Sequence, residues 1–558
     1  MAVPSRGSIT LTSAMGGPLR RAHVSFAATW AGESALLVAL SVLAFRQGGS
    51  SAVGLVTAVR MMAAALLVPF AATVADRVRR ERVLTGIGVA RAVMLSIAAC
   101  ATAVGGPVAI TYLAAAAATV ALALFRPAHS ALLPALAKSP GDLTSANAVR
   151  GMLDSLATLG GPVAVGVILA VSNVAVALAL CAGLSLLGGL VVLGLPYDPP
   201  PRAVPAKVSP ARDVAEGFRT IAGDRNLSLI TGLGAVQTFT RGCLTVLAVV
   251  IAIDLLDLGD PGVAILNAAI GAGGVVGSIS AFALVRRGGL GTWFGVGIAL
   301  FGAPLALVGV FPTTGVAVLL LGLVGIGNAL IDACGFTLLA RLTDEIVLAR
   351  MFAGFEAVLT LGVALGGLAA SFFVETFTPR GVLVVVGLLA PAAVLATLPA
   401  QRRLDNEMHV RDADIAVLRT VRMLRVLPAA TIGQLGDGLQ HVELAPGTVL
   451  FEQGDTGDRF YVVESGVAEV LQRGRLINTL GRGDGFGEIA LLRETPRTAT
   501  VRAGSGEPLR VAAMERSRFL TAVTGYPSSA TAAEETVNAI RQRDASRADQ
   551  SQDDPSAG

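Results

Sequence analysis

The sequence predicts a multi-domain protein. An all-α bundle of twelve membrane-spanning helices, arranged as two six-helix halves, precedes a cytoplasmic α+β β-roll. Of the 558 residues, 53% are hydrophobic and 15% are charged, whereas an average soluble chain carries about 25% charge. Apolar runs of about 20 residues, the length that crosses a bilayer, recur twelve times before residue 400. Beyond residue 400 the chain is first charged and then alternates apolar and polar residues between turn glycines, which is typical of β-strands.

Short loops, several of them containing glycine and proline, separate the expected spans. Their approximate extents are 24–45, 51–75, 83–104, 107–128, 150–171, 174–195, 227–253, 262–285, 291–311, 314–340, 348–374 and 380–400. We expect the chain to divide into a cytoplasmic N-terminal segment (1–23), an N-terminal half (24–195), a cytoplasmic inter-half linker (196–226), a C-terminal half (227–400), a charged linker helix (401–425), the β-roll domain (426–543) and a disordered tail (544–558). The inter-half linker includes an amphipathic segment at 211–225.

The basic residues predict the orientation of the bundle. They gather in the loops after the second, fourth and eighth spans and in 196–226, whereas the opposite loops hold few, chiefly Arg46 and Arg380. Under the positive-inside rule both termini are cytoplasmic, in a multi-pass protein of the inner (plasma) membrane. Lysine occurs only at Lys138 and Lys207, and this preference for arginine indicates a GC-rich bacterial source.

The composition also argues against several function classes. The net charge of +4 comes largely from residues in short loops rather than from a basic face, so no nucleic-acid partner is expected. The four cysteines stand singly in apolar spans and the four histidines are scattered. Neither pattern indicates a disulfide, a metal or a nucleophile–base pair. We therefore expect neither an enzyme active site nor a metal cofactor.

A weak internal repeat relates the two halves. Residues 131–136 (Ala-Leu-Leu-Pro-Ala-Leu) follow the fourth span, and the similar residues 337–342 (Thr-Leu-Leu-Ala-Arg-Leu) follow the tenth. Thr-Leu-Gly likewise recurs at 158–160 and 360–362. Repeated halves are typical of secondary transporters that rock about a central site. The repeat therefore predicts a small-molecule substrate that passes between the halves.

The loop after the second span carries a family signal. Residues 72–81 place Asp76, Arg77 and Arg80 at the spacing G-x-x-x-D-R-x-G-R-R of the major facilitator superfamily, which this part of the chain resembles. Both glycines and the final basic residue of that motif are replaced. The resemblance implies the facilitator fold and a gating role in which Asp76 locks the outward-open state. An ordinary positive-inside loop would explain the arginines but not the Asp-Arg pair.

The fifth span resembles the antiporter motif of drug-exporting facilitators, G-x-x-x-G-P-x-x-G-G. Gly161, Pro162 and Gly166 match, whereas Ala157 and Val165 stand where that motif has glycine. The resemblance favours export over import. Close helix packing in lipid, which small residues allow, is the alternative explanation.

Charged residues inside spans are costly in lipid and usually functional. Glu33, Arg60 and Arg241 lie near mid-bilayer by their position in the spans. In the superfamily that the chain resembles, helices 1, 4, 7 and 10 line the central cavity, which favours Glu33 as the proton-coupling residue. The alternative is a permanent ion pair of Glu33 with Arg60 or Arg241 that fixes helix packing. Arg91 is expected to be a packing partner. Gate ion pairs or snorkelling are expected of the charges nearer the cytoplasm, which are Arg126, Asp154, Asp332 and Glu356.

The strongest binding signal lies between residues 485 and 501. Glycines open a short apolar helical turn there, and an arginine follows. N–H groups at such a helix start attract anions, and a guanidinium binds phosphate in a bidentate manner. The stretch resembles the phosphate-binding cassette of cyclic-nucleotide-binding domains, Phe-Gly-Glu-(Ile/Leu)-(Ala/Ser)-Leu followed by Pro-Arg-(Ala/Thr)-Ala-(Thr/Ser)-Val. The matching site residues are Phe486, Gly487, Glu488, Ile489, Ala490, Arg497 and Thr498.

This resemblance implies roles for individual residues. Glu488 would hold the ribose 2′-OH, Arg497 the cyclic phosphate, and the backbone amides of Ile489 and Ala490 would complete the cradle. Bacterial prevalence favours cAMP over cGMP, while a hydroxyl at Thr498 is compatible with either nucleotide. A β-roll of the same shape that binds no ligand is the alternative.

Together these signals predict a secondary active transporter under cyclic-nucleotide control. We expect a proton-coupled exporter of hydrophobic small molecules, in which the bound nucleotide biases the alternating-access cycle. One alternative is a transporter of lysophospholipids or other lipid-like cargo under the same control. Another is a membrane-anchored cyclic-nucleotide sensor that does not transport.

Overall fold

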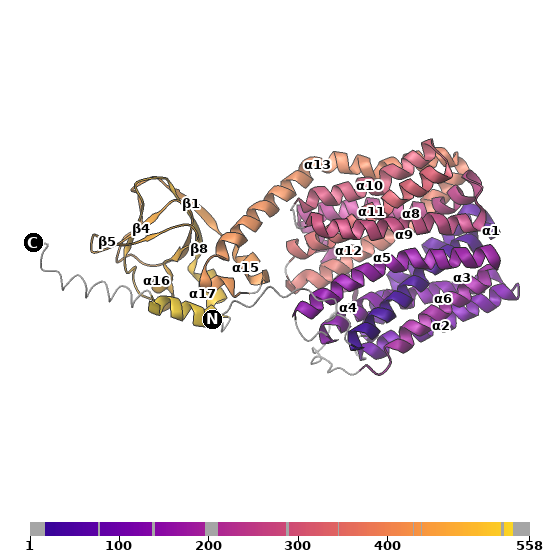
Figure 1. Cartoon of the computed structure of the whole chain (residues 1–558), viewed down its shortest axis with the longest axis horizontal. Coiled ribbons are helices and arrows are strands. Elements are labelled where there is room, and N and C mark those ends of the chain that lie inside the picture. The colour runs from indigo at the N-terminus through magenta and orange to yellow at the C-terminus, as the bar shows by residue number, and fades with distance from the viewer. Residues whose placement is uncertain are drawn as a thin grey trace, which may run out of the picture. The chain divides into compact units, whose positions relative to one another are not determined.

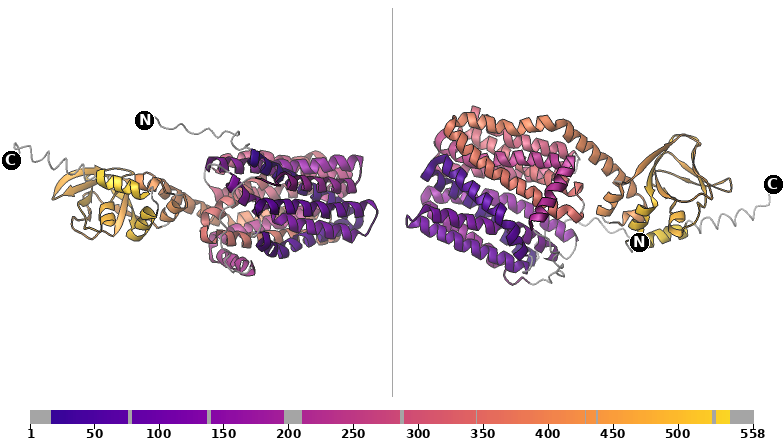
Figure 2. Two further views of the ribbon diagram at one scale, coloured as in Figure 1. Left: turned by 90° about the horizontal axis from the view of Figure 1, so that it is seen from below. Right: turned by 180° about the vertical axis from the view of Figure 1, so that it is seen from behind.

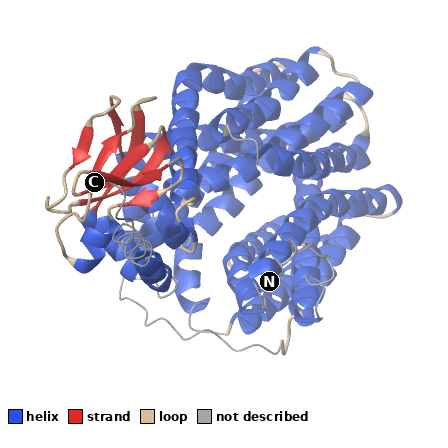
Figure 3. Cartoon of the chain, turned by 60° about the vertical axis from the view of Figure 1, so that its left-hand side comes forward, coloured by secondary structure: helices blue, strands red, loops and turns tan. Residues whose placement is uncertain are grey.

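The computed structural model of the chain describes residues 17–75, 79–136, 140–195, 210–285, 289–343, 345–427, 429–436, 438–525 and 529–539. The chain divides into two compact units, Met1–Asp405 and Asn406–Gly558. The described part of the first unit is helical, and all the strands lie in the second unit (Figure 3).

The helices of the first unit lie side by side with their axes nearly aligned, as Figure 1 and Figure 2 show. Their bounds are α1 (Gly17–Ala75), α2 (Arg80–Ala103), α3 (Val108–Ala123), α4 (Phe125–Leu136), α5 (Pro140–Val171), α6 (Val174–Val191), α7 (Pro210–Gly223), α8 (Arg225–Val250) with the π-helical turn η2 (Ile251–Leu255), α9 (Gly259–Val285), α10 (Leu290–Val310), α11 (Thr314–Leu342), α12 (Glu345–Thr376) and α13 (Pro379–Leu418). In Figure 1 the helices of each half gather together, and α5 and α9 lie beside each other where the halves meet.

Eleven helices of the described part are long and apolar enough to cross a membrane. The first of these, α1, contains two non-helical residues, Gly48 and Gly49. Gly49 has a φ of 61°, a left-handed conformation that glycine adopts without strain. This break separates the two predicted spans 24–45 and 51–75, so α1 and the other ten helices account for all twelve predicted spans. Leucine and valine side chains remain exposed on the bundle, such as Val104 at 81%, as helices in contact with lipid require.

The last span continues beyond its predicted end at residue 400. Helix α13 runs without a break through the first part of the predicted linker helix to Leu418. Gln401 and Leu404 are each 1% exposed, so one face of the helix stays buried after the apolar run ends. The amphipathic segment predicted between the halves forms α7, and its Glu216 accepts a hydrogen bond of 2.9 Å from Arg350 of α12.

The second unit is built on two four-stranded antiparallel sheets, with strand orders β1-β8-β3-β6 and β2-β7-β4-β5. The strands are β1 (Gln440–Leu444), β2 (Val449–Phe451), β3 (Arg459–Ser465), β4 (Ala468–Gln472), β5 (Arg475–Leu480), β6 (Gly485–Phe486), β7 (Thr500–Ala503) and β8 (Leu509–Glu515). Short helices accompany them: α14 (Arg422–Arg425), α15 (Ala429–Gly436), α16 (Glu488–Arg493) and α17 (Arg516–Thr524), followed by a helical segment at 529–539. Buried side chains from both sheets, including Tyr461, Val501 and Val511, fill the space between them.

Candidate functional sites

The cassette begins where β6 ends and α16 starts. Gly487 has a φ of 90°, and a Cβ added there would lie 2.6 Å from Nη1 of Arg497. Glycine is therefore needed at this position for both its backbone conformation and its lack of a side chain. Helix α16 follows at once, so the first-turn N–H groups, including those of Ile489 and Ala490, lack acceptors within the helix.

Arg497 is held beside this turn and is 3% exposed. Its Nη2 donates to the Arg459 carbonyl at 2.8 Å and its Nη1 to the Gly487 carbonyl at 3.1 Å. The ring of Phe451 lies 4.2 Å from the guanidinium carbon, within cation–π range. Nε has no hydrogen-bond partner among the residues that the structure describes. The surroundings thus fix the guanidinium and leave its Nε–H, besides the second N–H of each terminal nitrogen, available to a ligand.

Glu488 is the first residue of α16 and is also 3% exposed. Burial raises the pKa of its carboxyl to about 7. Within the described part of the chain its Oε2 accepts no hydrogen bond, and a buried acceptor without a donor is costly. A ligand hydroxyl would satisfy it. The free donor of Arg497 and the free acceptor of Glu488 therefore fit a ligand that offers an anion and a hydroxyl, as a cyclic ribose phosphate does.

Two further cassette residues differ in exposure. Phe486 is 5% exposed and stacks on Tyr461 with ring centroids 5.3 Å apart, so it belongs to the core of the β-roll. Thr498 is exposed, where its hydroxyl is accessible to a ligand.

In the first unit, Glu33 belongs to a closed cluster of charges. Its Oε1 accepts a hydrogen bond from Arg60 and its Oε2 one from Arg91, both at 2.9 Å. Arg60 also donates to the Thr119 hydroxyl and Arg91 to the Ala118 carbonyl, again at 2.9 Å. The two arginine side chains are 3% and 0% exposed. This cluster ties both spans of α1 to α2 and α3.

A second, open cluster joins charges from both halves: Arg126 of α4, Asp154 of α5, Arg241 of α8, Asp332 of α11 and Glu356 of α12 interact electrostatically. Arg126 lies 3.5 Å from Asp154. Arg241, Asp332 and Glu356 are exposed although they lie on apolar helices. No ion pair within 4 Å involves these three side chains in the described ranges.

Trp30 belongs to the N-terminal side of this open cluster. Its ring lies 4.3 Å from the guanidinium carbon of Arg126. Trp30, Arg126 and Asp154 are thus the contribution of the N-terminal half to the open cluster.

The structure groups the predicted transport residues differently from the sequence. Glu33 and Arg60 meet, as the ion-pair alternative anticipated, but their third member is Arg91, which the sequence identified only as a packing partner. Arg241 lies instead with Asp332 and Glu356. The sequence contains one indication of this grouping: the apolar tenth and eleventh spans each carry an acidic residue, Asp332 and Glu356.

The gating and antiporter-like motifs are described to different extents. Asp76 and Arg77 lie outside the described residues, and Arg80 is the first residue of α2. In α5, which contains Pro162, a Cβ on Gly161 would lie 2.8 Å from the Ala35 nitrogen of α1. A Cβ on Gly166 would lie 2.7 Å from the Ala264 side chain of α9. The two glycines therefore permit close helix contacts, one within the N-terminal half and one between the halves.

The halves are joined by polar contacts at the end of the bundle where α1 breaks. Arg46 forms an ion pair with Asp260 of α9. Ser371 of α12 donates a hydrogen bond of 2.8 Å to the Ser50 carbonyl of α1, and Gly54 contacts the same serine.

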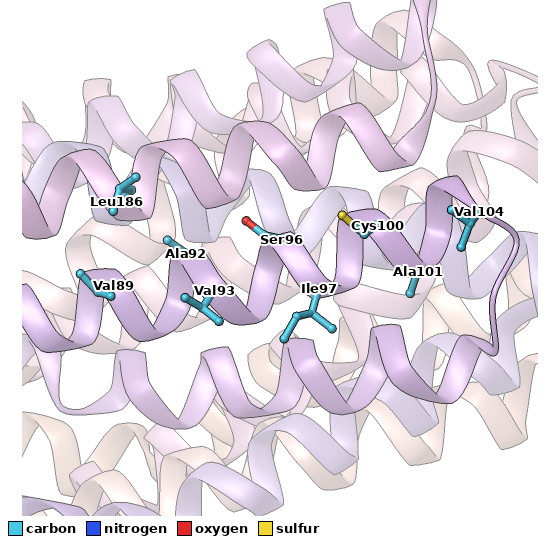
Figure 4. A pocket seen from close by; sticks show the side chains of 9 residues that line it. All are labelled: Val89, Ala92, Val93, Ser96, Ile97, Cys100, Ala101, Val104 and Leu186. Atoms are coloured by element: carbon cyan, nitrogen blue, oxygen red, sulfur yellow. The ribbon is translucent and has the colours of Figure 1, made fainter.

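A pocket of 640 Å³ lies on α2, with Leu186 contributed by α6; Figure 4 shows the side chains that line it. Its lining is aliphatic apart from Ser96 and Cys100 and carries no charge. This pocket suits hydrocarbon, and it contains no residue of either charge cluster.

Comparisons with known proteins identify both parts of the chain. Residues 441–526 match the family model of the cyclic nucleotide-binding domain, and residues 22–321 match that of the Major Facilitator Superfamily. The chain is 32% identical over 214 residues to the cAMP-dependent protein kinase regulatory subunit of Schizosaccharomyces pombe, a match that covers 37% of this chain and 50% of that relative. It is 39% identical over 118 residues to the corresponding subunit of Yarrowia lipolytica, covering 21% and 31%.

The chain thus spans half or less of the length of these curated relatives. A crystal structure of the nucleoside transporter NupG aligns with a TM-score of 0.58 and 14% identity, over 69% of this chain and 99% of that one, which shows a shared fold. These findings describe a multi-pass membrane protein with the fold of transporters rather than of enzymes. Because the facilitator match covers more than half of the sequence, the chain belongs to the Major Facilitator Superfamily, and it carries a C-terminal cyclic nucleotide-binding domain.

Proposed function

We propose that the chain is a secondary active transporter whose alternating-access cycle is biased by a cyclic nucleotide. One observation carries this proposal. A facilitator fold, in which the exposed Asp332 and Glu356 form no ion pair among the described residues, is continuous with a domain whose buried cassette leaves Nε of Arg497 and Oε2 of Glu488 without partners there. Coupling of this kind typically changes a binding equilibrium by about 5- to 150-fold.

The nucleotide is cAMP in this proposal, with cGMP as the alternative. Arg497 binds the cyclic phosphate, Glu488 accepts a hydrogen bond from the ribose 2′-OH, and the amides of Ile489 and Ala490 complete the phosphate cradle. The kinase regulatory subunits that share this domain are named for cAMP dependence, which supports cAMP here.

For transport we propose proton-coupled export of hydrophobic small molecules, with the open cluster as the working site. Asp332 and Glu356 are exposed charges without an ion-pair partner in the described residues. Because an exposed carboxylate without an ion pair remains free to change its charge, and carboxylates within spans often form proton relays, we infer that they exchange a proton during the cycle. Glu33, the carboxylate favoured by sequence, has both oxygens occupied by arginines, and we assign it a structural role.

The expected orientation in the membrane indicates which end of the helix bundle is closed in this structure. If both termini are cytoplasmic in the plasma membrane, as the loop arginines predict, the contacts of Arg46 and Ser371 close the outer end. The open cluster then faces the cytoplasm. Lipid-like cargo is the alternative substrate, and the uncharged pocket on α2 supports it.

The test is flux through the full chain in proteoliposomes that contain a pH-sensitive dye. A panel of lipophilic substrates is assayed with and without cAMP or cGMP inside the compartment that holds the nucleotide domain. We expect substrate movement to be accompanied by opposite proton movement and to change several-fold with cAMP, but not in Arg497→Ala. Nucleotide binding without flux of any substrate would favour the sensor alternative instead.

A further inference from the structure

The boundary between the two units falls within one helix, between Asp405 and Asn406 of α13. Asp405 is bound to the first turn of α10. Its Oδ1 accepts a hydrogen bond from the Gly291 nitrogen at 2.6 Å, and its Oδ2 accepts from the Thr292 nitrogen at 2.9 Å and the Thr292 hydroxyl at 2.5 Å. The last residue of the membrane unit therefore caps another membrane helix.

The local sequence of α10 is suited to this external cap. Its N-cap residue, Gly289, has no side chain to serve the free N–H groups and adopts a left-handed φ of 71°. A side chain from elsewhere must satisfy those donors, and a carboxylate is favoured there by the helix dipole. Gly291 permits the approach, because a Cβ on it would lie 3.0 Å from Oδ1 of Asp405 and 3.1 Å from the Gln401 carbonyl.

Helix α13 is also fixed on both sides of this cap. One turn earlier, Gln401 is 1% exposed and donates to the Thr397 hydroxyl at 2.9 Å, while its side chain contacts Gly295 of α10. Further along, Leu418 is fully buried in the core of the second unit. Nε2 of His441 on β1 lies 3.4 Å from Oδ1 of Asp414. The same helix is thus part of the transporter fold and part of the nucleotide domain.

Helix α10 in turn reaches the open charge cluster. Gly297 packs so closely on α11 that a Cβ there would lie 3.0 Å from the Gly327 carbonyl and 3.1 Å from the Ile331 nitrogen. Ile331 directly precedes Asp332. A shift of α10 would consequently move the segment of α11 that carries Asp332.

We propose that Asp405 is the joint through which nucleotide binding alters transport, an inference that rests on the proposed function. A rotation or displacement of α13 changes the fit of the carboxylate on α10, and α10 transmits the change to α11. Coupling between distant sites requires such a contiguous set of packed elements with two arrangements. Asp405 touches neither the nucleotide site nor the open cluster, so it acts as a positioning residue.

The test compares the full chain with Asp405→Asn in proteoliposomes and measures flux with and without cAMP together with cAMP affinity. Asparagine has the size of aspartate but only one acceptor oxygen for three donors. We expect the nucleotide response to fall at least about fivefold, while cAMP affinity and flux without nucleotide stay within about twofold of the parent. Asn406→Ala, at the adjacent exposed position, is the matched control and should keep the response.

Thr292→Ala serves as a second variant in case Asp405→Asn does not fold. It removes the hydrogen bond that the Thr292 hydroxyl donates to Asp405. We expect it to reduce the effect of cAMP on flux by a smaller factor than Asp405→Asn does. If cAMP changes the flux of the parent and of both variants by the same factor, the proposed role of Asp405 is refuted while the proposed function stands. If the parent itself ignores cAMP, the proposed function fails first.

Discussion

The two charge clusters of the membrane unit hold their carboxylates in opposite ways. Both carboxylate oxygens of Glu33 accept hydrogen bonds from arginines that are almost fully buried. Asp332 and Glu356 are exposed, and within the described ranges neither forms an ion pair. Both kinds of carboxylate lie in apolar helices, so the hydropathy of the surrounding span does not distinguish them. Ion pairing and exposure do, and they separate a group that fixes the fold from one that is free to change its charge.

The physical reason is the cost of leaving a charge alone in low dielectric. A buried pair loses most of its solvation, and removal of one member exposes the other to that cost. A carboxylate at a water-accessible position avoids much of the penalty and remains available to a proton or a cationic group. The comparison therefore predicts different consequences for the same Glu→Gln or Asp→Asn change at the two clusters.

The largest effect is expected for Glu33→Gln, which leaves two buried guanidiniums without an anion. We expect a loss of about 3–5 kcal/mol of stability, visible as a large drop in the thermal midpoint of the purified chain in detergent. Glu375→Gln, which changes an exposed acid on α12, provides the control. A folded and stable Glu33→Gln chain that has lost only proton coupling would show that Glu33 does not fix the fold, and would restore the proton-coupling role that the sequence favours for it.

Asp332→Asn tests the open cluster. Because the exposed carboxylate has no ion pair to lose in the described structure, the thermal midpoint should change little. Proton-coupled flux should fall more than about tenfold if this group exchanges the proton, since each coupled cycle then depends on it. Glu356→Gln should give a similar but smaller loss. Normal coupling in both variants would show that the open cluster is not the working site.

The sequence predicted the elements better than it predicted these partnerships. Apolar length gave the twelve spans, and the residues around Gly48 gave the break in α1. The positions of Glu33, Arg60 and Arg91 along their spans were also readable. Which of them meet depends on the rotation and order of the helices, and neither is recorded in a single sequence. The sequence consequently offers either Arg60 or Arg241 as the ion-pair partner of Glu33, whereas in the structure Arg60 pairs with Glu33 and Arg241 interacts with Asp332.

In the β-roll, too, local elements are predictable from the sequence, whereas contacts between distant segments are not. Local patterns predict the cassette residues and turns at Gly447, Gly454, Gly457 and Gly466, and of these glycines all but Gly457 have a positive φ. The alternation over 441–450 predicts a strand there, whereas the structure has two, β1 and β2, separated by a turn in which Gly447 has a φ of 80°. The free atoms of Glu488 and Arg497 depend on burial by distant segments such as β2 and β3, so they could be found only in the folded chain.

Glu488 is a third kind of carboxylate, buried but without an ion pair among the residues that the structure describes, and the smallest effect is predicted for it. Burial raises its pKa to about 7, so at pH 6 most of the ligand-free protein carries the protonated form. A ribose hydroxyl that donates to Glu488 favours the ionised form, and binding must then release a proton. We therefore expect cAMP affinity of the full chain to rise up to about tenfold between pH 6 and pH 8, following the ionised fraction of the free site.

Calorimetric titration in two buffers of different ionisation enthalpy would measure both the affinity and the released proton. Glu488→Gln, which has nearly the same size and cannot ionise, should bind cAMP more weakly at pH 8 and show no such pH dependence. Arg497→Lys provides a matched control that weakens phosphate binding while leaving Glu488 in place, so its affinity should still rise with pH. An unchanged pH dependence in Glu488→Gln would assign the proton to another group. It would also mean that this buried carboxylate, like Glu33, keeps one charge state throughout.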